Sequence, residues 1–108
     1  MEITIDFSRI KDLSSFHSAF KETMGFPEFY GRNMDAWIDC MSCIDDPDAG
    51  MSAVTVKSDE SLEIVLLSIE TAIKSCPDVF QGFLKCVAFV NQRFIGSNSG
   101  TRLKLIAT

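Results

Sequence analysis

The spacing of the apolar residues changes several times along these 108 residues, and this alternation constrains the fold more than any other feature. Over residues 2–7 they recur at every second position, which is the period of a strand with one buried face. Over residues 13–24 they recur at every third or fourth position, and Gly25 follows where a helix C-terminus favours glycine. The sequence therefore predicts a first strand followed by an amphipathic helix.

The later segments continue this alternation. A second helical stripe covers residues 34–44 and begins after Asn33, a good N-cap. The segment SAVTVK, residues 52–57, is rich in β-branched residues and predicts a second strand. Helices over residues 62–73 and 77–96 and a third strand over residues 101–108 complete the series. Strands separated by helices are usually parallel, so we expect a single α/β domain over residues 1–108, in which helices pack against a three-stranded parallel sheet.

The charge balance narrows the partners and the compartment. Fifteen acidic and ten basic residues give a formal net charge of -5, which opposes binding to nucleic acid or anionic lipid and favours a cationic protein partner. The N-terminus carries acids where a secretory signal would carry basic residues. No apolar run approaches the roughly 18 residues that a membrane-spanning helix needs. We therefore expect a cytoplasmic protein without a membrane partner.

The four cysteines and the lone histidine suggest no catalytic or metal site. Without an export signal, Cys40, Cys43, Cys76 and Cys86 are expected to be reduced and to act as small apolar residues. The Cys40-x-x-Cys43 pair lies late in its helix, away from the end that lowers a thiol pKa, and no second motif of zinc-ligand spacing accompanies it. His17 is expected to be solvated or locally bonded and receives no role. We expect no cofactor and no metal.

Asp35 and Asp39 are four residues apart, so a helix makes their like charges neighbours on the face opposite its apolar stripe. Their repulsion costs only about 0.2–0.5 kcal/mol, so they could form an ordinary solvated face. A second interpretation makes them the paired carboxylates of an enzyme of unknown type, although no histidine, lysine or Gly-rich loop accompanies them at a recognisable spacing. In a third, they await a cationic protein partner.

The segment FPEFYGRNMDAWIDCM, residues 26–41, resembles the barstar family of intracellular inhibitors of a secreted bacterial ribonuclease. The residues in the family's order and spacing are Pro27, Glu28, Tyr30, Gly31, Asn33, Asp35, Ala36 and Asp39. Beyond residue 50 the resemblance is in the order of elements only, and that order is also the family's.

The resemblance implies that the chain is not an enzyme and has no catalytic residues. It implies that the turn and helix block a ribonuclease active site, with Asp35 and Asp39 in the place of RNA phosphates. The implied partner-binding residues are Phe29, Tyr30, Gly31, Asn33, Asp35 and Asp39. The implied partner is a basic ribonuclease or a toxin nuclease, and the free inhibitor is expected to be a monomer. A regulatory binding module without a nuclease partner is the remaining alternative.

Several residues depart from the family's pattern. Phe29 replaces a tyrosine, and Trp37 and Ile38 reverse the usual position of the bulky aromatic residue. Arg32 replaces an acid beside the motif, where a basic cleft would repel it. Asp78 is the only acid on the last helix, and the glutamate that the family uses there has no clear counterpart. These departures imply an altered contact surface.

Overall fold

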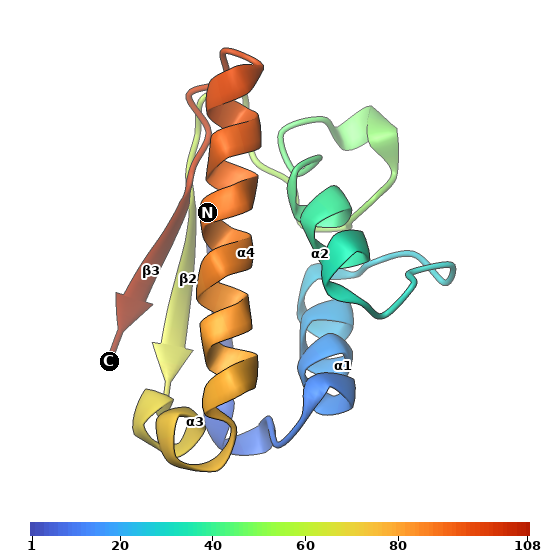
Figure 1. The fold of residues 1–108 in the computed structure, drawn as a ribbon. Helices are drawn as coiled ribbons and strands as arrows, with labels where there is room; N and C mark the ends of the chain where they lie inside the picture. Colours follow the sequence, from blue (N-terminus) through green and yellow to red (C-terminus); the bar gives the residue numbers. More distant parts are fainter.

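A computed structural model describes all 108 residues and places the helices on one side of a three-stranded sheet (Figure 1). Strand β1 (Glu2–Asp6), strand β2 (Leu62–Leu67) and strand β3 (Leu103–Ala107) lie side by side in that order. Both pairs are parallel, with Ile3 opposite Ile64 and Ile64 opposite Leu105. The expected α/β fold with a three-stranded parallel sheet is therefore confirmed.

Four α-helices connect the strands. They are α1 (Leu13–Met24), α2 (Met34–Met41), α3 (Ile69–Ser75) and α4 (Pro77–Gly96). Single 3-10 turns occur at Phe7–Arg9 and Pro47–Ala49. The predicted order of strand, helix, helix, strand, helix, helix and strand is confirmed. None of these helices is both long and apolar enough to cross a membrane.

One prediction about the second strand is wrong. The segment 52–57 forms no strand, and β2 occupies the first half of the segment that was predicted as a helix over residues 62–73. Apolar residues in LEIVLL fit both a helical spacing and a continuous buried strand, and a central strand of a parallel sheet is apolar on both faces. The helix begins only at Ile69. The order of elements survives because α3 still follows the strand.

The segment 52–57 has no regular secondary structure, and its backbone bonds to the end of α1 and to the turn after α2. The backbone N–H of Ala53 donates to Met24 O at 2.9 Å, and the N–H of Val56 donates to Ile44 O at 2.9 Å. Gly25 lies at φ 67°, and a Cβ there would meet Ala53 Cβ at 2.5 Å. The β-branched residues of this segment therefore form no strand, because its backbone bonds go to residues near the helix ends and to no neighbouring strand.

The core lies between the sheet and the helices and contains a cluster of aromatic rings. The Trp37 ring centroid is 5.4 Å from that of Phe20 and 5.9 Å from that of Phe83. Trp37 and Met41 are completely buried, as their place on the helical stripe predicts. The stripe on α2 therefore faces the core, and its opposite face is left for solvent.

Helix α4 lies across the sheet, and α2 packs beside it (Figure 1). The two helices meet where Gly82 of α4 faces Met34 of α2, and a Cβ at position 82 would be in ordinary contact with Met34 Cε at 3.6 Å. The next residue of α4, Phe83, is buried in the aromatic core, and Leu84 after it is 40% exposed. The solvent face of α2 and one edge of α4 therefore form a continuous surface.

Candidate functional site

The turn before α2 holds three aromatic residues in different environments. Phe26 and Tyr30 are buried, and their ring centroids lie 4.7 Å apart. The N–H of Tyr30 donates to Pro27 O at 2.9 Å and closes the turn. Phe29 lies between them in sequence and is 75% exposed. The turn therefore presents the Phe29 ring to solvent while its neighbours anchor it from within.

His17 is part of that anchor and corrects the expectation of a solvated or locally bonded imidazole. It is 2% exposed, and a hydrogen bond of 2.5 Å joins its Nδ1 to the hydroxyl of Tyr30, 13 residues away. Burial, with a contribution from the Arg32 charge, lowers the pKa of His17, and burial raises the pKa of the Tyr30 hydroxyl. Both groups are therefore neutral near pH 7, and this pair fixes the turn to α1. One sequence signal was available, because His17 lies at helical spacing from Phe20 and Met24.

Asn33 starts α2 and positions the two aspartates. Its side chain accepts a hydrogen bond from the N–H of Ala36 at 2.8 Å, so the expected N-cap is confirmed. Asp35 lies in the first turn, where a negative charge suits the helix dipole, and Asp39 follows one turn later. Both aspartates are solvent-exposed, as expected. We call the surface formed by Phe29, Gly31, Asn33, Asp35 and Asp39 the α2 face.

Helix α4 contributes residues that the sequence interpretation missed. The Nη1 atom of Arg93 donates to Asp39 Oδ1 at 2.8 Å. A hollow of about 400 Å³ lies on the surface where the two helices meet and is lined by Asp35, Ile38, Phe89, Gln92 and Arg93. Phe89 and Arg93 lie off the buried stripe of α4 by one position, which is the available signal for them. We call this feature the α2–α4 hollow.

Arg32 is directed onto α1. Its backbone is in the left-handed region at φ 54°. Its Nη2 atom donates to the backbone oxygen of Ser14 at 2.9 Å and to the Oγ of Ser18 at 2.9 Å. These bonds tie the turn to α1 a second time. Arg32 therefore borders the α2 face without pairing with either of its carboxylates.

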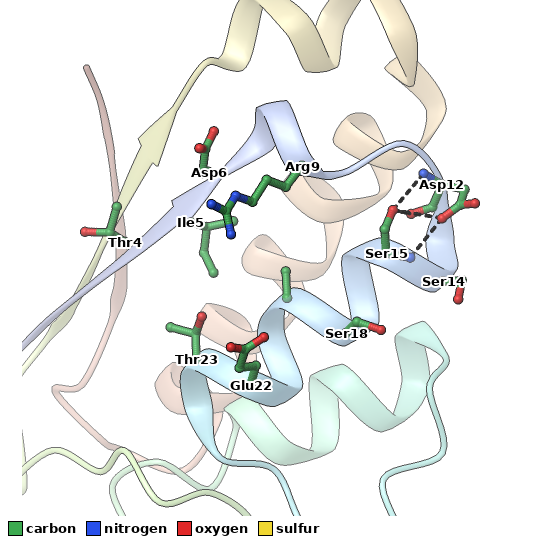
Figure 2. Close-up of a pocket in the computed structure, with 11 residues that line it drawn as sticks. Thr4, Ile5, Asp6, Arg9, Asp12, Ser14, Ser15, Ser18, Glu22 and Thr23 are labelled. Atoms are coloured by element: carbon green, nitrogen blue, oxygen red, sulfur yellow. Dashed lines mark hydrogen bonds between the residues drawn. The ribbon is translucent and has the colours of Figure 1, made fainter.

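A larger hollow of about 750 Å³ lies between β1 and α1 (Figure 2). Hydroxyl groups and charged side chains line it, including Asp6, Arg9 and Glu22. The hydrogen bonds drawn there belong to the cap of α1, in which Asp12 accepts from the N–H of Ser15 at 2.8 Å. These two polar side chains are therefore engaged in starting the helix.

The cysteines do not assemble into a site. All four are free thiols, and all but the partly buried Cys43 are buried. Burial, together with the nearby Cys43 and Asp39, raises the pKa of Cys40 to about 11. Cys40 also lies in the last turn of α2 and Cys43 directly follows its C-cap, so the helix dipole disfavours a thiolate at both positions. The pair therefore consists of one core thiol and one partly buried thiol, both with raised pKa values.

A protein-family model matches nearly the whole length of this chain, and an individual relative matches part of it. The family model described as Barstar (barnase inhibitor) matches residues 1–106. A stretch of 41 residues is 37% identical to the protein of Bacillus subtilis (strain 168) named "Putative ribonuclease inhibitor YrdF". That stretch covers 38% of this chain and 45% of the relative, so it spans less than half of the relative's length. The family match includes the α2 face and the α2–α4 hollow.

Proposed function

Because this chain belongs to the barstar family, we propose that it is an inhibitor whose α2 face blocks the active site of a ribonuclease. The partner is the cell's own secreted ribonuclease or a toxin nuclease, with Arg and Lys side chains that hold RNA phosphates. The inhibitor acts in the cytoplasm, as a monomer when free. It does not bind nucleic acid directly, because its net charge of -5 repels a polyanion.

One observation carries this proposal: two exposed carboxylates stand one helical turn apart beside an exposed aromatic ring, on a surface fixed from inside. Such spacing lets both carboxylates enter one cleft. Pairing with Arg and Lys becomes stronger as the cleft excludes water, and the negative surface speeds the encounter. Because the turn and helix are already ordered, binding costs little conformational entropy.

Each residue of the proposed interface has a distinct task. Asp35 and Asp39 pair with the cations that otherwise hold phosphate. Phe29 packs its exposed ring on the rim of the cleft, and Gly31 leaves the backbone of the turn open to a close approach. Asn33 sets the direction of α2 through its cap. Tyr30 acts from beneath, since its ring is buried and its hydroxyl is bonded to His17.

We propose binding without catalysis. A pair of catalytic carboxylates works in a cleft that surrounds substrate and excludes water. Asp35 and Asp39 instead project from an exposed helix, and the group that contacts Asp39 is the guanidinium of Arg93, which stays protonated and cannot serve as a base. An inhibitory surface uses the same charges without that requirement.

The test is a binding measurement with ribonucleases, including barnase and any nuclease that co-purifies with the chain. Asp39→Ala should weaken binding about 30-fold or more, because truncating one partner of a buried charge pair costs about 2–5 kcal/mol, a range that draws in part on barnase and barstar. Glu2→Ala is the matched control, since it removes an exposed carboxylate from β1, outside the α2 face. Equal effects of the two substitutions would reject the α2 face as the interface.

A further inference from the structure

Arg93 of α4 distinguishes the two carboxylates of the α2 face. It lies 2.8 Å from Asp39, and the two side chains are 54% and 59% exposed. No basic side chain lies within ion-pair distance of Asp35, because the other ion pairs of the structure involve the N-terminus and Lys21. The α2 face therefore carries one free carboxylate near its N-cap and one neutralised carboxylate beside α4.

We propose that Arg93 is a selectivity residue of the α2 face: it neutralises Asp39 in the free protein and favours a partner that brings an acidic group for its guanidinium. This inference rests on the proposed function of the α2 face as a partner-binding surface. The preferred partner is a protein with a basic cleft for Asp35 and Asp39 and a carboxylate on the rim that meets α4.

The guanidinium of Arg93 has donors to spare for that carboxylate. An arginine side chain offers five N–H donors in one plane, and Arg93 uses only Nη1 on Asp39. Gln92 and Phe89 line the same hollow, and Phe89 is 55% exposed. A partner carboxylate on the α4 side of the hollow would meet the guanidinium, an amide and an aromatic ring, whereas the Asp35 carboxylate on the α2 side disfavours a position deeper in the hollow. Arg93 can thus bridge Asp39 and the partner's acid in one complex.

A partner whose cleft holds only cations should bind the α2 face less tightly than a partner that also brings a carboxylate for Arg93. Its Arg or Lys must displace Arg93 from Asp39 or accept a like charge close by. An exposed ion pair contributes about 0–1 kcal/mol, which corresponds to at most about fivefold in affinity. Arg93 is therefore a filter of modest strength, and its effect on partner choice adds to that of the aspartates.

The test uses two peptides, Arg-Arg-Arg-Arg-Arg and Arg-Arg-Glu-Arg-Arg, whose binding to α2 is followed by NMR chemical shifts at about 10 mM salt, where the Debye length is about 30 Å. The wild-type chain is compared with Arg93→Gln and with Lys85→Gln. Lys85 is exposed on the same helix, about 12 Å away along its axis, and its replacement removes the same charge. A second background carries Asp39→Asn, which removes the group that Arg93 pairs with.

Arg93→Gln should raise affinity for the all-arginine peptide about threefold to fivefold and should not raise affinity for the peptide that contains glutamate. Lys85→Gln should change the affinities for the two peptides by equal factors. In the background that carries Asp39→Asn, Arg93→Gln should also change both affinities by equal factors. Equal behaviour of Arg93→Gln and Lys85→Gln would overturn the proposal, as would a selective effect that persists without Asp39. Because no nuclease is involved, a chain that passes this test and inhibits no ribonuclease would refute the proposed function while Arg93 keeps its role.

Discussion

Tyr30 and Phe29 are adjacent aromatic residues whose replacement should have opposite consequences. Tyr30→Phe keeps the buried ring and its contact with Phe26 and removes only the hydroxyl that is bonded to His17. Phe29→Ala removes a ring that is 75% exposed. We expect the first to lower the stability of the fold and the second to weaken partner binding with the fold intact.

The size of the Tyr30→Phe effect follows from what remains in the core. The Nδ1 atom of His17 would be left without its partner in a side chain that is only 2% exposed. Leaving a buried polar group unsatisfied costs about 1–3 kcal/mol. For a chain of this length, each kcal/mol shifts Tm by about 4 °C, so the midpoint should fall by about 4–12 °C. Phe29→Ala should change the free energy of unfolding by less than about 0.5 kcal/mol.

Urea unfolding followed by the fluorescence of Trp37 measures both variants, because this single tryptophan is completely buried. Double substitution of Tyr30 and His17 by phenylalanine is the check on mechanism. Removing both polar groups should cost less than removing the hydroxyl alone, since no unpaired group is then buried. A Tyr30→Phe variant as stable as the wild type would show that this hydrogen bond does not anchor the turn.

Three further outcomes concern the fold. Burial lowers the pKa of His17 below its ordinary 6.5, so the unfolded chain binds a proton at this residue more readily than the folded chain. The contribution of His17 to the free energy of unfolding is therefore fully present above about pH 6.5 and is lost as the pH falls through the folded pKa. His17→Gln should make the free energy of unfolding from urea titrations depend less on pH in this range. Since the pKa of Cys40 is raised to about 11, native Cys40 should react with a disulfide reagent at pH 8 far more slowly than in urea, where all four thiols should react; equal rates would contradict its burial. Gly25→Ala should cost more than about 1 kcal/mol in thermal unfolding because of its positive φ and the contact with Ala53, whereas Gly50→Ala, also at φ 67° but with open space around it, should cost less.

Local patterns in the sequence predict most of the fold because they report burial directly. The period of two in β1, the cap at Asn33 and the stripe with Trp37 and Met41 each correspond to what the structure contains. The segment Leu62–Leu67 was misassigned because a short apolar run fits a helix and a central strand equally well. Only its pairing with a strand on each side makes this segment a strand, and that pairing depends on residues about 40 or more positions away.

The candidate site was predictable only where its residues are local. The exposure of Asp35 and Asp39 follows from their place on one helix, and the resemblance identified their neighbourhood. Arg93 was missed because it lies 54 residues from Asp39, and only the packing of α2 on α4 brings the two together. The bond between His17 and Tyr30 similarly joins two elements. Contacts between elements determine the charge and rigidity of this surface, and no single segment displays them.

Above all, we propose that the α2 face occupies a ribonuclease active site. The most direct measurement is the rate of RNA cleavage by barnase, and by any ribonuclease that co-purifies with the chain from its native host, as the wild-type chain is titrated in at several RNA concentrations. At least one of these enzymes should lose its activity at one equivalent of inhibitor, more RNA should relieve the inhibition, and Asp39→Ala should abolish it at the same concentration. If every enzyme still cleaves RNA at full rate with the chain in excess, or if inhibition is indifferent both to RNA concentration and to Asp39, the α2 face does not block a ribonuclease active site.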